Sequence, residues 1–305
     1  MSSTPVLSVV IPSWNTKDYL AACLASLAAA DKPACEVIVV ENASTDGSLE
    51  LLRTRHPEVQ LIVNARNEGF ARGCNQGLRV ARGRYVLLLN TDTEVASDAL
   101  ALLVRYLDQH PDHGAVAPRL VHRDGTTQRT VQEFPTLKTA LFFSTPLERW
   151  FPDSRELRRY FLRDWDQTSS RDVDQPPAAV LCLRKAMLDQ IGLFDEDLWL
   201  FYNDVDLAKR MRAAGWKTHY LAEACVVHHV GGSTSKFADF VATWQRDRLR
   251  YYRKHHGRLG AWWLKACVTF TLLDWLVTQL ARRLRGRPAE PIRPTLAGYR
   301  TFLGQ

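Results

Sequence analysis

Three short polar segments contain residues whose types and spacing could support chemistry on a phosphorylated ligand. The first, Asn90-Thr91-Asp92, directly follows the apolar run Tyr85–Leu89. An acidic residue at the end of a strand can hold a divalent cation that bridges a diphosphate, and its hard oxygen atoms suit Mg²⁺ or Mn²⁺. Asn and Asp are also common turn formers, so this segment alone leaves both interpretations open.

The second segment, Asn203-Asp204-Val205-Asp206-Leu207, carries two carboxylates two positions apart and is followed by Arg210. If a helix begins near Asp204, the two carboxylates point to different faces. One could then remove a proton from an acceptor hydroxyl, while the other caps the helix or pairs with Arg210. The alternative is an acid-rich helix start, which the helix dipole favours.

The third segment is His228-His229-Val230-Gly231-Gly232-Ser233-Thr234. A neutral histidine is a common metal ligand, and glycines let the backbone approach a phosphate. A strand end followed by a flexible loop is the alternative interpretation.

Four apolar runs separated by helical patterns must position these residues. Such alternation predicts βαβ units and a parallel sheet, whose ligands bind at the carboxyl ends of the strands. Leu20, Cys23, Leu24 and Leu27 share one face of the first predicted helix, and Ser44 or Asp46 could cap the second. The runs are Val6–Ile11, Glu36–Val40, Val59–Val63 and Tyr85–Leu89, and the polar segments that follow them are Pro12–Asn15, Glu41–Asp46, Asn64–Gly69 and Asn90–Glu94.

The periodic pattern weakens between Pro118 and Pro177, where we expect loops and short elements that form an acceptor-side lid. An apolar run at Ala178–Leu183 and a helix around Lys185–Ile191 follow. The six cysteines are scattered without a Cys-x-x-Cys pair, which argues against a zinc cluster or a disulfide framework. Met1–Pro12 has no basic start and no long apolar run, so we expect no cleaved signal peptide.

Together, and in this order, the segments resemble the GT-A glycosyltransferases of family 2, in particular the rhamnosyltransferase-like branch that builds bacterial cell-surface polysaccharides. The resemblance covers residues 7–235. Agreement of all its motifs by chance is far rarer than agreement of any one. Besides the second and third segments, the motifs are Val9–Asn15, Val39–Ser48, Asn67–Gly77, Leu88–Thr93 and Gly192–Glu196.

The resemblance implies an α/β fold of the GT-A, Rossmann-like type, with a mostly parallel sheet flanked by helices. It also implies roles for matching residues. Asp204 would be the general base, Asp92 would coordinate Mg²⁺ or Mn²⁺ with help from Asn90, and His228 would be a further metal or diphosphate contact. Glu41 would read the base of the nucleotide. Further contacts to the nucleotide sugar would come from Pro12, Ser13, Trp14, Asn67, Gly69 and Thr91.

The chain departs from the family pattern at four positions. Glu41 stands where Asp is usual, Asn90 replaces the first acid of an Asp-x-Asp motif, and Asn203 stands where Glu is usual. A glycine often found near Ala178 is missing. The Asn90 replacement leaves the expected metal with fewer charged ligands.

The activity implied by the resemblance is a single displacement that inverts the anomeric centre. A metal and nearby donors stabilise the leaving diphosphate, and a carboxylate activates the acceptor. The branch suggests dTDP-rhamnose as the donor, while UDP- and GDP-sugars remain open. The acceptor would be a glycan or a polyprenyl-linked saccharide.

The C-terminal segment is basic and apolar. From Trp244 onward there are 13 Lys and Arg against three Asp and Glu, whereas the preceding 243 residues carry 27 basic and 30 acidic groups. Asp274, Thr271 and Thr278 fall on one strip of the predicted helix 259–280, opposite a broad apolar face that includes Trp262. We expect residues 259–287 to lie on a membrane surface; a helix packed on protein is the alternative.

These expectations divide the chain into a transferase domain, residues 1–240, and a helical extension, residues 241–305. The protein would be cytoplasmic and peripheral on the inner face of the cell membrane. A non-catalytic relative of the family stays open as a second class. Nucleic-acid binding is disfavoured because the basic excess lies in one tail. A dinucleotide-dependent oxidoreductase is disfavoured because no glycine fingerprint follows the first strand.

Overall fold

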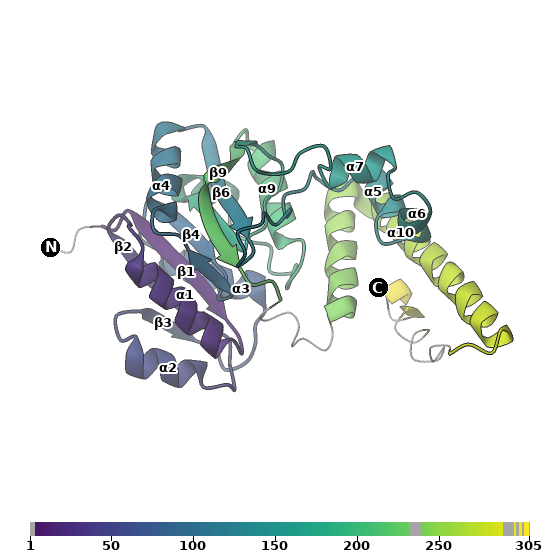
Figure 1. The fold of residues 1–305 in the computed structure, drawn as a ribbon, viewed down its shortest axis with the longest axis horizontal. Helices are drawn as coiled ribbons and strands as arrows, with labels where there is room; N and C mark the ends of the chain where they lie inside the picture. The colour runs from purple at the N-terminus through teal and green to yellow at the C-terminus, as the bar shows by residue number, and fades with distance from the viewer. Residues whose placement is uncertain (1–3, 232–239, 289–295, 297–298, 301, 305) are drawn as a thin grey trace. The chain divides into compact units, whose positions relative to one another are not determined.

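The computed structural model describes residues 4–231, 240–288, 296, 299–300 and 302–304. The chain divides into two compact units, each considered by itself. One comprises Met1–Gln132 with Trp165–Ala238, and the other comprises Glu133–Asp164 with Asp239–Gln305 (Figure 1). The second unit thus includes a stretch from within residues 1–240, so the two units differ from the division expected from the sequence. A functional boundary near residue 240 stays a prediction.

The first unit is a nine-stranded sheet flanked by helices. Its strand order is β3-β2-β1-β4-β8-β6-β9-β5, and β7 pairs with β9. The strands are β1 (Leu7–Ser13), β2 (Cys35–Glu41), β3 (Gln60–Val63), β4 (Tyr85–Leu89), β5 (Thr93–Val95), β6 (His113–Val121), β7 (Arg171–Asp172), β8 (Val180–Arg184) and β9 (Lys217–His228). The helices are α1 (Lys17–Ala29), α2 (Ser48–Arg55), α3 (Phe70–Val80), α4 (Ala99–Gln109), α8 (Lys185–Ile191) and α9 (Asn203–Ala213).

The parallel arrangement predicted from the four apolar runs is confirmed for β1 to β4. The other half of the sheet is mixed. β8 runs antiparallel to both β4 and β6. The chain leaves β6 at the end of the sheet where β4 also ends, and β8 begins at that same end. β9 is parallel to β6, and β5 and β7 are antiparallel to β9.

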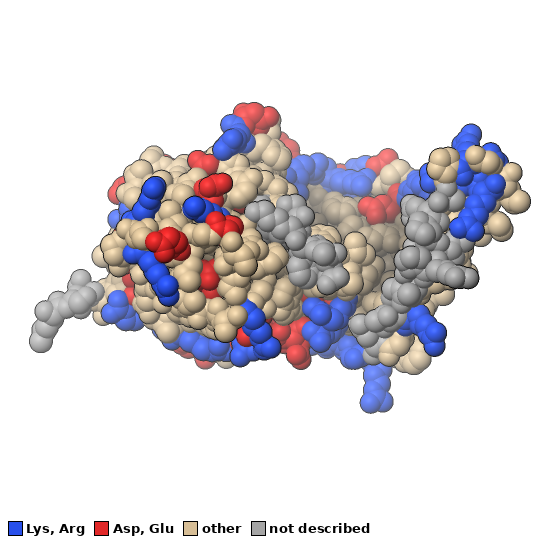
Figure 2. All heavy atoms as spheres, turned by 90° about the horizontal axis from the view of Figure 1, so that it is seen from below, with Lys and Arg blue, Asp and Glu red and all other residues tan. Residues whose placement is uncertain are grey.

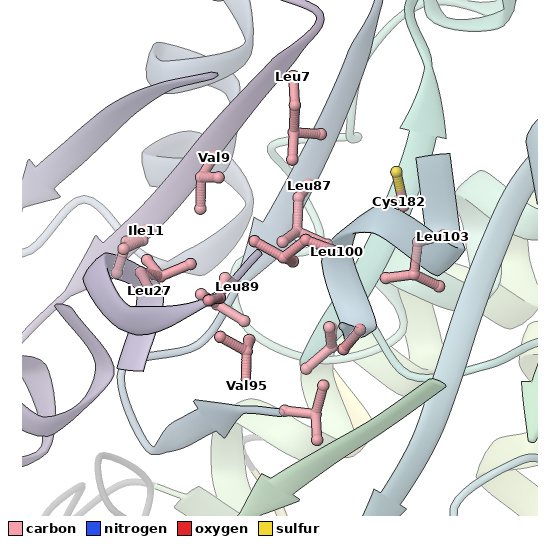
Figure 3. Close-up of a cluster of buried hydrophobic side chains, with 14 of the residues drawn as sticks. Leu7, Val9, Ile11, Leu27, Leu87, Leu89, Val95, Leu100, Leu103 and Cys182 are labelled. Carbon is pink, nitrogen blue, oxygen red and sulfur yellow. The ribbon is translucent and has the colours of Figure 1, made fainter. Parts of the chain in front are cut away.

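The main core lies between one face of this sheet and helices α1 and α4 (Figure 3). Val9 and Ile11 of β1 belong to it, as do Leu20, Cys23, Leu24 and Leu27, the four residues predicted to share one face of α1. Val10 points to the opposite face, where α3 packs. A Cβ atom on Gly77 of α3 would lie 2.3 Å from Val10 Cγ1, so this glycine permits the close approach.

Asp46, one of the two residues predicted to cap α2, satisfies the first amides of two helices. Its Oδ1 accepts from Ser48 N at 3.0 Å, and its Oδ2 accepts from Lys17 N, at the start of α1, at 2.8 Å. These hydrogen bonds outweigh the effect of burial and hold the pKa of Asp46 below its ordinary value. The loops after β1 and β2 are therefore fixed to each other at the carboxyl edge of the sheet.

The second unit is helical. It contains α5 (Leu137–Phe142), α6 (Pro146–Trp150), α7 (Arg155–Tyr160) and α10 (Phe240–Leu284). Gly257, with φ of 67° and ψ of −167°, breaks α10 into two helices, and the bend is visible in Figure 1. Arg248 is almost fully buried, with its Nη2 3.2 Å from the carbonyl oxygen of Phe143. The short elements predicted between Pro118 and Pro177 are thus confirmed, while their role as a lid stays a prediction.

Candidate active site

Polar loops meet at the carboxyl edge of the parallel strands, as the βαβ pattern predicts. Asn15 N donates to Ser44 Oγ at 2.9 Å, and Asn15 Oδ1 accepts from Thr45 N at 2.8 Å. Asn42 extends the connection to the third loop, because its Nδ2 donates to the carbonyl oxygen of Gly69 at 3.2 Å. The residues predicted to line a nucleotide pocket therefore belong to one connected group of loops.

Glu41, the predicted base reader, is buried and engaged with its own loop. One of its carboxyl oxygens accepts from Ala43 N at 3.1 Å and the other from Ser44 N at 2.7 Å. The residue thus shapes the turn that follows β2. Contact between Glu41 and a base stays a prediction. Neighbouring Ser13 is buried across the β1–β2 pairing from Glu41, while Pro12 and Trp14 are half-buried.

Asn67 and Gly69 form a tight turn against Trp199. Asn67 Oδ1 accepts from Gly69 N at 3.0 Å, and Gly69 has a φ of +90°. A Cβ atom on Gly69 would lie 2.4 Å from Trp199 Nε1. The carbonyl oxygen of Trp199 also accepts from Phe70 N at 2.9 Å, at the start of α3. Gly69 is thus required by a side chain of the protein itself, and its contact with the nucleotide sugar stays a prediction.

Asp92 and His228, the two predicted metal ligands, are brought together by strand pairing. Thr93 of β5 is the register partner of His228 of β9, and the carbonyl oxygen of Asp92 accepts from His229 N at 2.8 Å. Asp92 Oδ1 lies 3.6 Å from His228 Nε2, and both side chains are largely buried. Thr91, also predicted to contact the ligand, is buried next to Asp92, and Asn90 is half-buried.

Gln128, which sequence reasoning did not identify, fixes the ring of His228. Its Nε2 donates to the carbonyl oxygens of His228 at 2.6 Å and Val121 at 3.3 Å, so its Oε1 faces His228 Nδ1 at 3.0 Å and accepts a hydrogen bond from that nitrogen. This tautomer leaves the lone pair on Nε2, the nitrogen nearest Asp92. Burial also lowers the pKa of His228, which keeps the imidazole neutral at neutral pH.

The Asp92–His228 pair fits a divalent cation. A carboxylate oxygen and an unprotonated imidazole nitrogen 3.6 Å apart can bind one ion after a small closure, and Gln128 supplies the outer hydrogen bond typical of ligating histidines. Gly231 is described, whereas Gly232, Ser233 and Thr234 of the same predicted segment lie outside the described residues.

Asp204 and Asp206 have different environments, as their spacing on a helix predicts. Asp206 is fully buried and its Oδ2 lies 2.9 Å from Arg210 Nε, which confirms the predicted pairing. Asp204 is half-buried, and its two oxygens accept from Val205 N at 2.8 Å and Ala178 N at 3.3 Å. Burial raises the pKa of Asp204 above its ordinary value. A carboxylate with a raised pKa is a stronger proton acceptor.

The start of β8 connects Asp204 with the segment that carries Asp92. Ala178 N donates to Asp204, and the carbonyl oxygen of the next residue, Ala179, accepts from Asn90 N at 2.8 Å. Tyr202, directly before α9, has a φ of 61°, a strained conformation for a residue with a side chain. Asn203 is buried and its Nδ2 donates to the carbonyl oxygen of Leu200 at 2.8 Å, so it holds the turn that presents Asp204.

Known proteins resemble this chain in sequence and in fold. Residues 8–189 match the model of glycosyl transferase family 2. The chain is 26% identical over 293 residues to the N-acetylglucosaminyl-diphospho-decaprenol L-rhamnosyltransferase of Mycobacterium tuberculosis, which covers 88% of this chain and 90% of that protein.

Solved structures share the fold. A mannosyltransferase of Pyrobaculum calidifontis, solved with GDP-Man and Mn²⁺, has a TM-score of 0.54 at 19% identity and covers 99% of this chain and 86% of its own. TarS of S. aureus has a TM-score of 0.53 at 19% identity, over 81% of this chain and 38% of its own. The predicted GT-A fold class is therefore confirmed. The chain belongs to glycosyl transferase family 2 and is a glycosyltransferase.

Proposed function

We propose that the protein is an inverting, metal-dependent transferase that moves rhamnose from dTDP-rhamnose to a polyprenyl-linked saccharide in cell-wall glycan synthesis. The observation that carries this proposal is the Asp92–His228 pair, with Nε2 left unprotonated, at the same sheet edge as the half-buried Asp204. The first group fits the leaving diphosphate with its cation, and the second fits the acceptor hydroxyl.

Each residue then has one task in a single displacement. Asp204 takes the proton of the acceptor hydroxyl as that oxygen attacks the anomeric carbon. Asp92 and His228 would hold the cation, which would supply positive charge for the leaving diphosphate. The imidazole nitrogen favours Mn²⁺ over Mg²⁺, because Mg²⁺ prefers oxygen ligands in a strict octahedral geometry. Glu41, Pro12, Ser13 and Trp14 would form the nucleoside side of the site, with Asn67, Gly69, Asn90 and Thr91 along the diphosphate and sugar.

The donor and acceptor rest on the mycobacterial relative, whose name gives an L-rhamnosyl transfer to a decaprenyl-diphosphate-linked sugar. Its similarity spans nearly the whole length of both chains, so it extends beyond the nucleotide-binding half to the part of the fold that carries Asp204. A UDP- or GDP-sugar is the competing donor.

We expect dTDP-rhamnose to stabilise the purified protein against heat more in the presence of Mn²⁺ than in its absence. A ligand that binds only the folded state at about 100 times its Kd adds about 2.7 kcal/mol of stability. That corresponds to a rise in Tm of about 5–11 °C for a unit of this size. The measurement is a thermal-shift panel of dTDP-, UDP- and GDP-sugars, each with Mn²⁺, Mg²⁺ or EDTA.

The panel separates the parts of the proposal. A larger shift with a UDP- or GDP-sugar would replace the donor while keeping the metal-dependent site. Equal shifts in Mn²⁺ and EDTA would contradict the role of the Asp92–His228 pair. No shift with any donor, for a protein shown to be folded, would favour a non-catalytic relative of the family.

The second unit offers a surface for membrane contact, and we include that contact in the proposal. The polar strip of α10 is turned toward the protein, because Asp274 pairs with Arg149 of α6 at 3.1 Å and Thr271 Oγ1 donates to the carbonyl oxygen of Ser144 at 3.4 Å. Another stripe of the helix is apolar and 56–84% exposed: Leu259, Trp262, Leu273, Val277, Leu280 and Leu284. α10 also buries apolar residues such as Leu264, Val268 and Leu272, so the exposed stripe is a second apolar surface of the same helix.

A basic group continues this apolar stripe. Arg282, Arg283, Arg285 and Arg287 are exposed at the end of α10, and Figure 2 shows Lys and Arg side chains gathered at the right-hand end of the view. Anionic headgroups attract such a cluster. Helix Phe240–Leu284 meets the length and composition of a membrane span. The Gly257 break and the Asp274–Arg149 pair favour a helix that lies in the interface, on the cytoplasmic face where a polyprenyl-linked acceptor would be met.

Replacing Leu273, Val277 and Leu280 by Gln should abolish flotation of the protein with vesicles containing anionic lipid, because the substitutions remove the apolar area that enters the headgroup region. The matched control replaces Val63, Val80 and Val241 by Gln, three exposed valines outside the stripe, and should float like the unmodified protein. Equal flotation of the stripe variant and the control would place the anchor elsewhere.

A further inference from the structure

A second cluster of metal-binding side chains lies far from the candidate active site. His113 Nε2 and His219 Nδ1 lie 3.1 Å and 2.7 Å from the same atom, Asp172 Oδ1, and the three atoms are all within 4.8 Å of one another. It is the one group of three such ligands found among the described residues. His113 lies at the first residue of β6. His228 lies near the last residue of β6, because Val121 pairs with Val227 of β9. The length of the extended strand β6 therefore separates the two histidines by roughly 25 Å.

The hydrogen bonds of His113 point to a cation. The ring is buried, and its Nδ1 lies 2.9 Å from Asp112 Oδ1 while its Nε2 lies 3.1 Å from Asp172 Oδ1. A neutral imidazole has one proton, so when Nδ1 donates to Asp112, Nε2 carries a lone pair. That nitrogen faces the hydroxyl of Tyr106 at 3.3 Å and the carboxylate of Asp172 at 3.1 Å, and a cation between Nε2 and Asp172 would bind the lone pairs of both.

The second carboxylate is arranged as it is around ligating histidines. Asp112 also pairs with Lys217 Nζ at 2.7 Å. This ion pair keeps the Asp112 carboxylate ionised and directed at Nδ1 of His113. A carboxylate that accepts from Nδ1 fixes the tautomer of the imidazole and makes Nε2 a better metal ligand. Asp112 therefore acts through His113 and does not itself contact the ion.

The three ligands are held in place by the sheet and by one aromatic ring. Asp172 of β7 and His219 of β9 are register partners, and β9 is paired with β6, which carries His113. Tyr106 stacks on His219 with ring centroids 4.3 Å apart and stands edge-on to His113 at 5.4 Å. Rings fixed in this way lose little freedom when an ion binds.

We propose that His113, Asp172 and His219 form a binding site for Zn²⁺ or a similar transition-metal ion, separate from the catalytic cation. Two imidazole nitrogens and one carboxylate oxygen suit zinc and disfavour Mg²⁺ and Ca²⁺, which prefer oxygen ligands. Zinc ligands lie about 2.0–2.2 Å from the ion, so ligand atoms in a tetrahedral shell are about 3.4 Å apart, and each of the two nitrogens needs to move away from Asp172 Oδ1 by less than about 1 Å. The ion would tie the two-residue strand β7 to β6 and β9, and water would complete its tetrahedral shell.

The test uses the full chain carrying Asp92→Ala, which removes the catalytic metal pair from the measurement. After treatment with EDTA, we expect this protein to bind one equivalent of Co²⁺ with the visible absorption of a tetrahedral site. Zn²⁺ should then displace the Co²⁺ and raise the Tm. Adding His219→Gln should reduce binding to well below one equivalent and remove the rise in Tm.

A second variant and a matched control keep the result interpretable. Asp172→Asn, at a partly exposed side chain, should also lose the bound equivalent of Co²⁺. This variant replaces His219→Gln in the test if His219→Gln fails to fold. His110→Gln should keep it, because His110 stacks on the same tyrosine but directs its Nδ1 at the carbonyl oxygen of Tyr106. Absence of Co²⁺ and Zn²⁺ binding by the Asp92→Ala protein would overturn the proposal, as would one equivalent retained in both ligand variants.

Discussion

Replacing Asp204 by Asn should lower kcat by about 10²–10⁴-fold, the usual contribution of a general base. The amide has nearly the same shape, and its oxygen can still accept from Val205 N while its NH2 group faces Ala178 N, but it cannot take a proton from the acceptor. Because the donor binds on the Asp92 side of the site, its affinity should stay within a few-fold. The measurements are transfer of a labelled sugar and donor binding by calorimetry.

The control for this substitution is Asp189→Asn, at an exposed carboxylate on α8, which should transfer sugar like the unmodified protein. Activity of Asp204→Asn equal to that of the control would remove Asp204 as the base. Loss of donor binding together with activity would assign Asp204 a role in the donor site.

The raised pKa of Asp204 gives this substitution a second, opposite effect on stability. Burial disfavours the charged form in the folded protein, so above the ordinary pKa of Asp the unfolded chain releases its proton more readily than the folded one. Ionised Asp204 therefore costs stability at neutral pH, and the neutral Asn variant should melt at the same temperature or higher. A rise in Tm with a loss of kcat would separate a catalytic role from a structural one.

Local patterns predicted the first half of the fold better than the second. β1, β2 and β4 are buried on both sides, which produces the continuous apolar runs from which they were predicted. β6 was not predicted, and of β9 only the end was considered, as one of two interpretations of the third polar segment. The sequence of β6 contains Gly114 and Pro118, which weaken a strand pattern, and the pairing of β9 with β6 is interrupted by two register shifts.

In the candidate site, the sequence predicted the residues that belong to motifs and missed those brought in by distant contacts. Asp92, His228 and Asp204 belong to short motifs, so their residue types could be read from the chain. Gln128 has no such signal, because its partner His228 is 100 positions away and the segment around it lacks periodicity. The contact between Gly69 and Trp199 depends on the sheet order that brings residues 192–202 to the start of α3, and spacing alone cannot reveal it.

The contact between Glu41 and a base stays a prediction, and the structure adds hydrogen bonds that the resemblance did not predict. The position of Glu41 at the end of β2 matches the predicted base-reading residue, yet both of its oxygens accept backbone amides of the loop that follows. An additional methylene relative to Asp lets the carboxylate fold back on its own turn. The residue type and the position were predictable, but the hydrogen bonds that occupy the side chain were not.

Replacing Asp92 by Ala should abolish the part of donor binding that depends on Mn²⁺. The substitution removes the charged partner of His228, and one neutral imidazole is a weak site for an ion that prefers oxygen ligands. In the thermal-shift assay, the difference in Tm between donor with Mn²⁺ and donor with EDTA should fall from several degrees to near zero. Transfer should fall with it, because the leaving diphosphate loses its counter-charge.

The matched control for Asp92→Ala is Asp98→Ala, which removes an exposed carboxylate six positions further along the chain and should keep the full effect of Mn²⁺. Replacing Gln128 by Leu should give an intermediate loss, since it leaves both ligands in place but frees the ring of His228 and its tautomer. An unchanged effect of Mn²⁺ in Asp92→Ala would move the catalytic cation away from this pair. A loss in Gln128→Leu alone would show that orientation of His228, more than the charge of Asp92, determines binding of the ion.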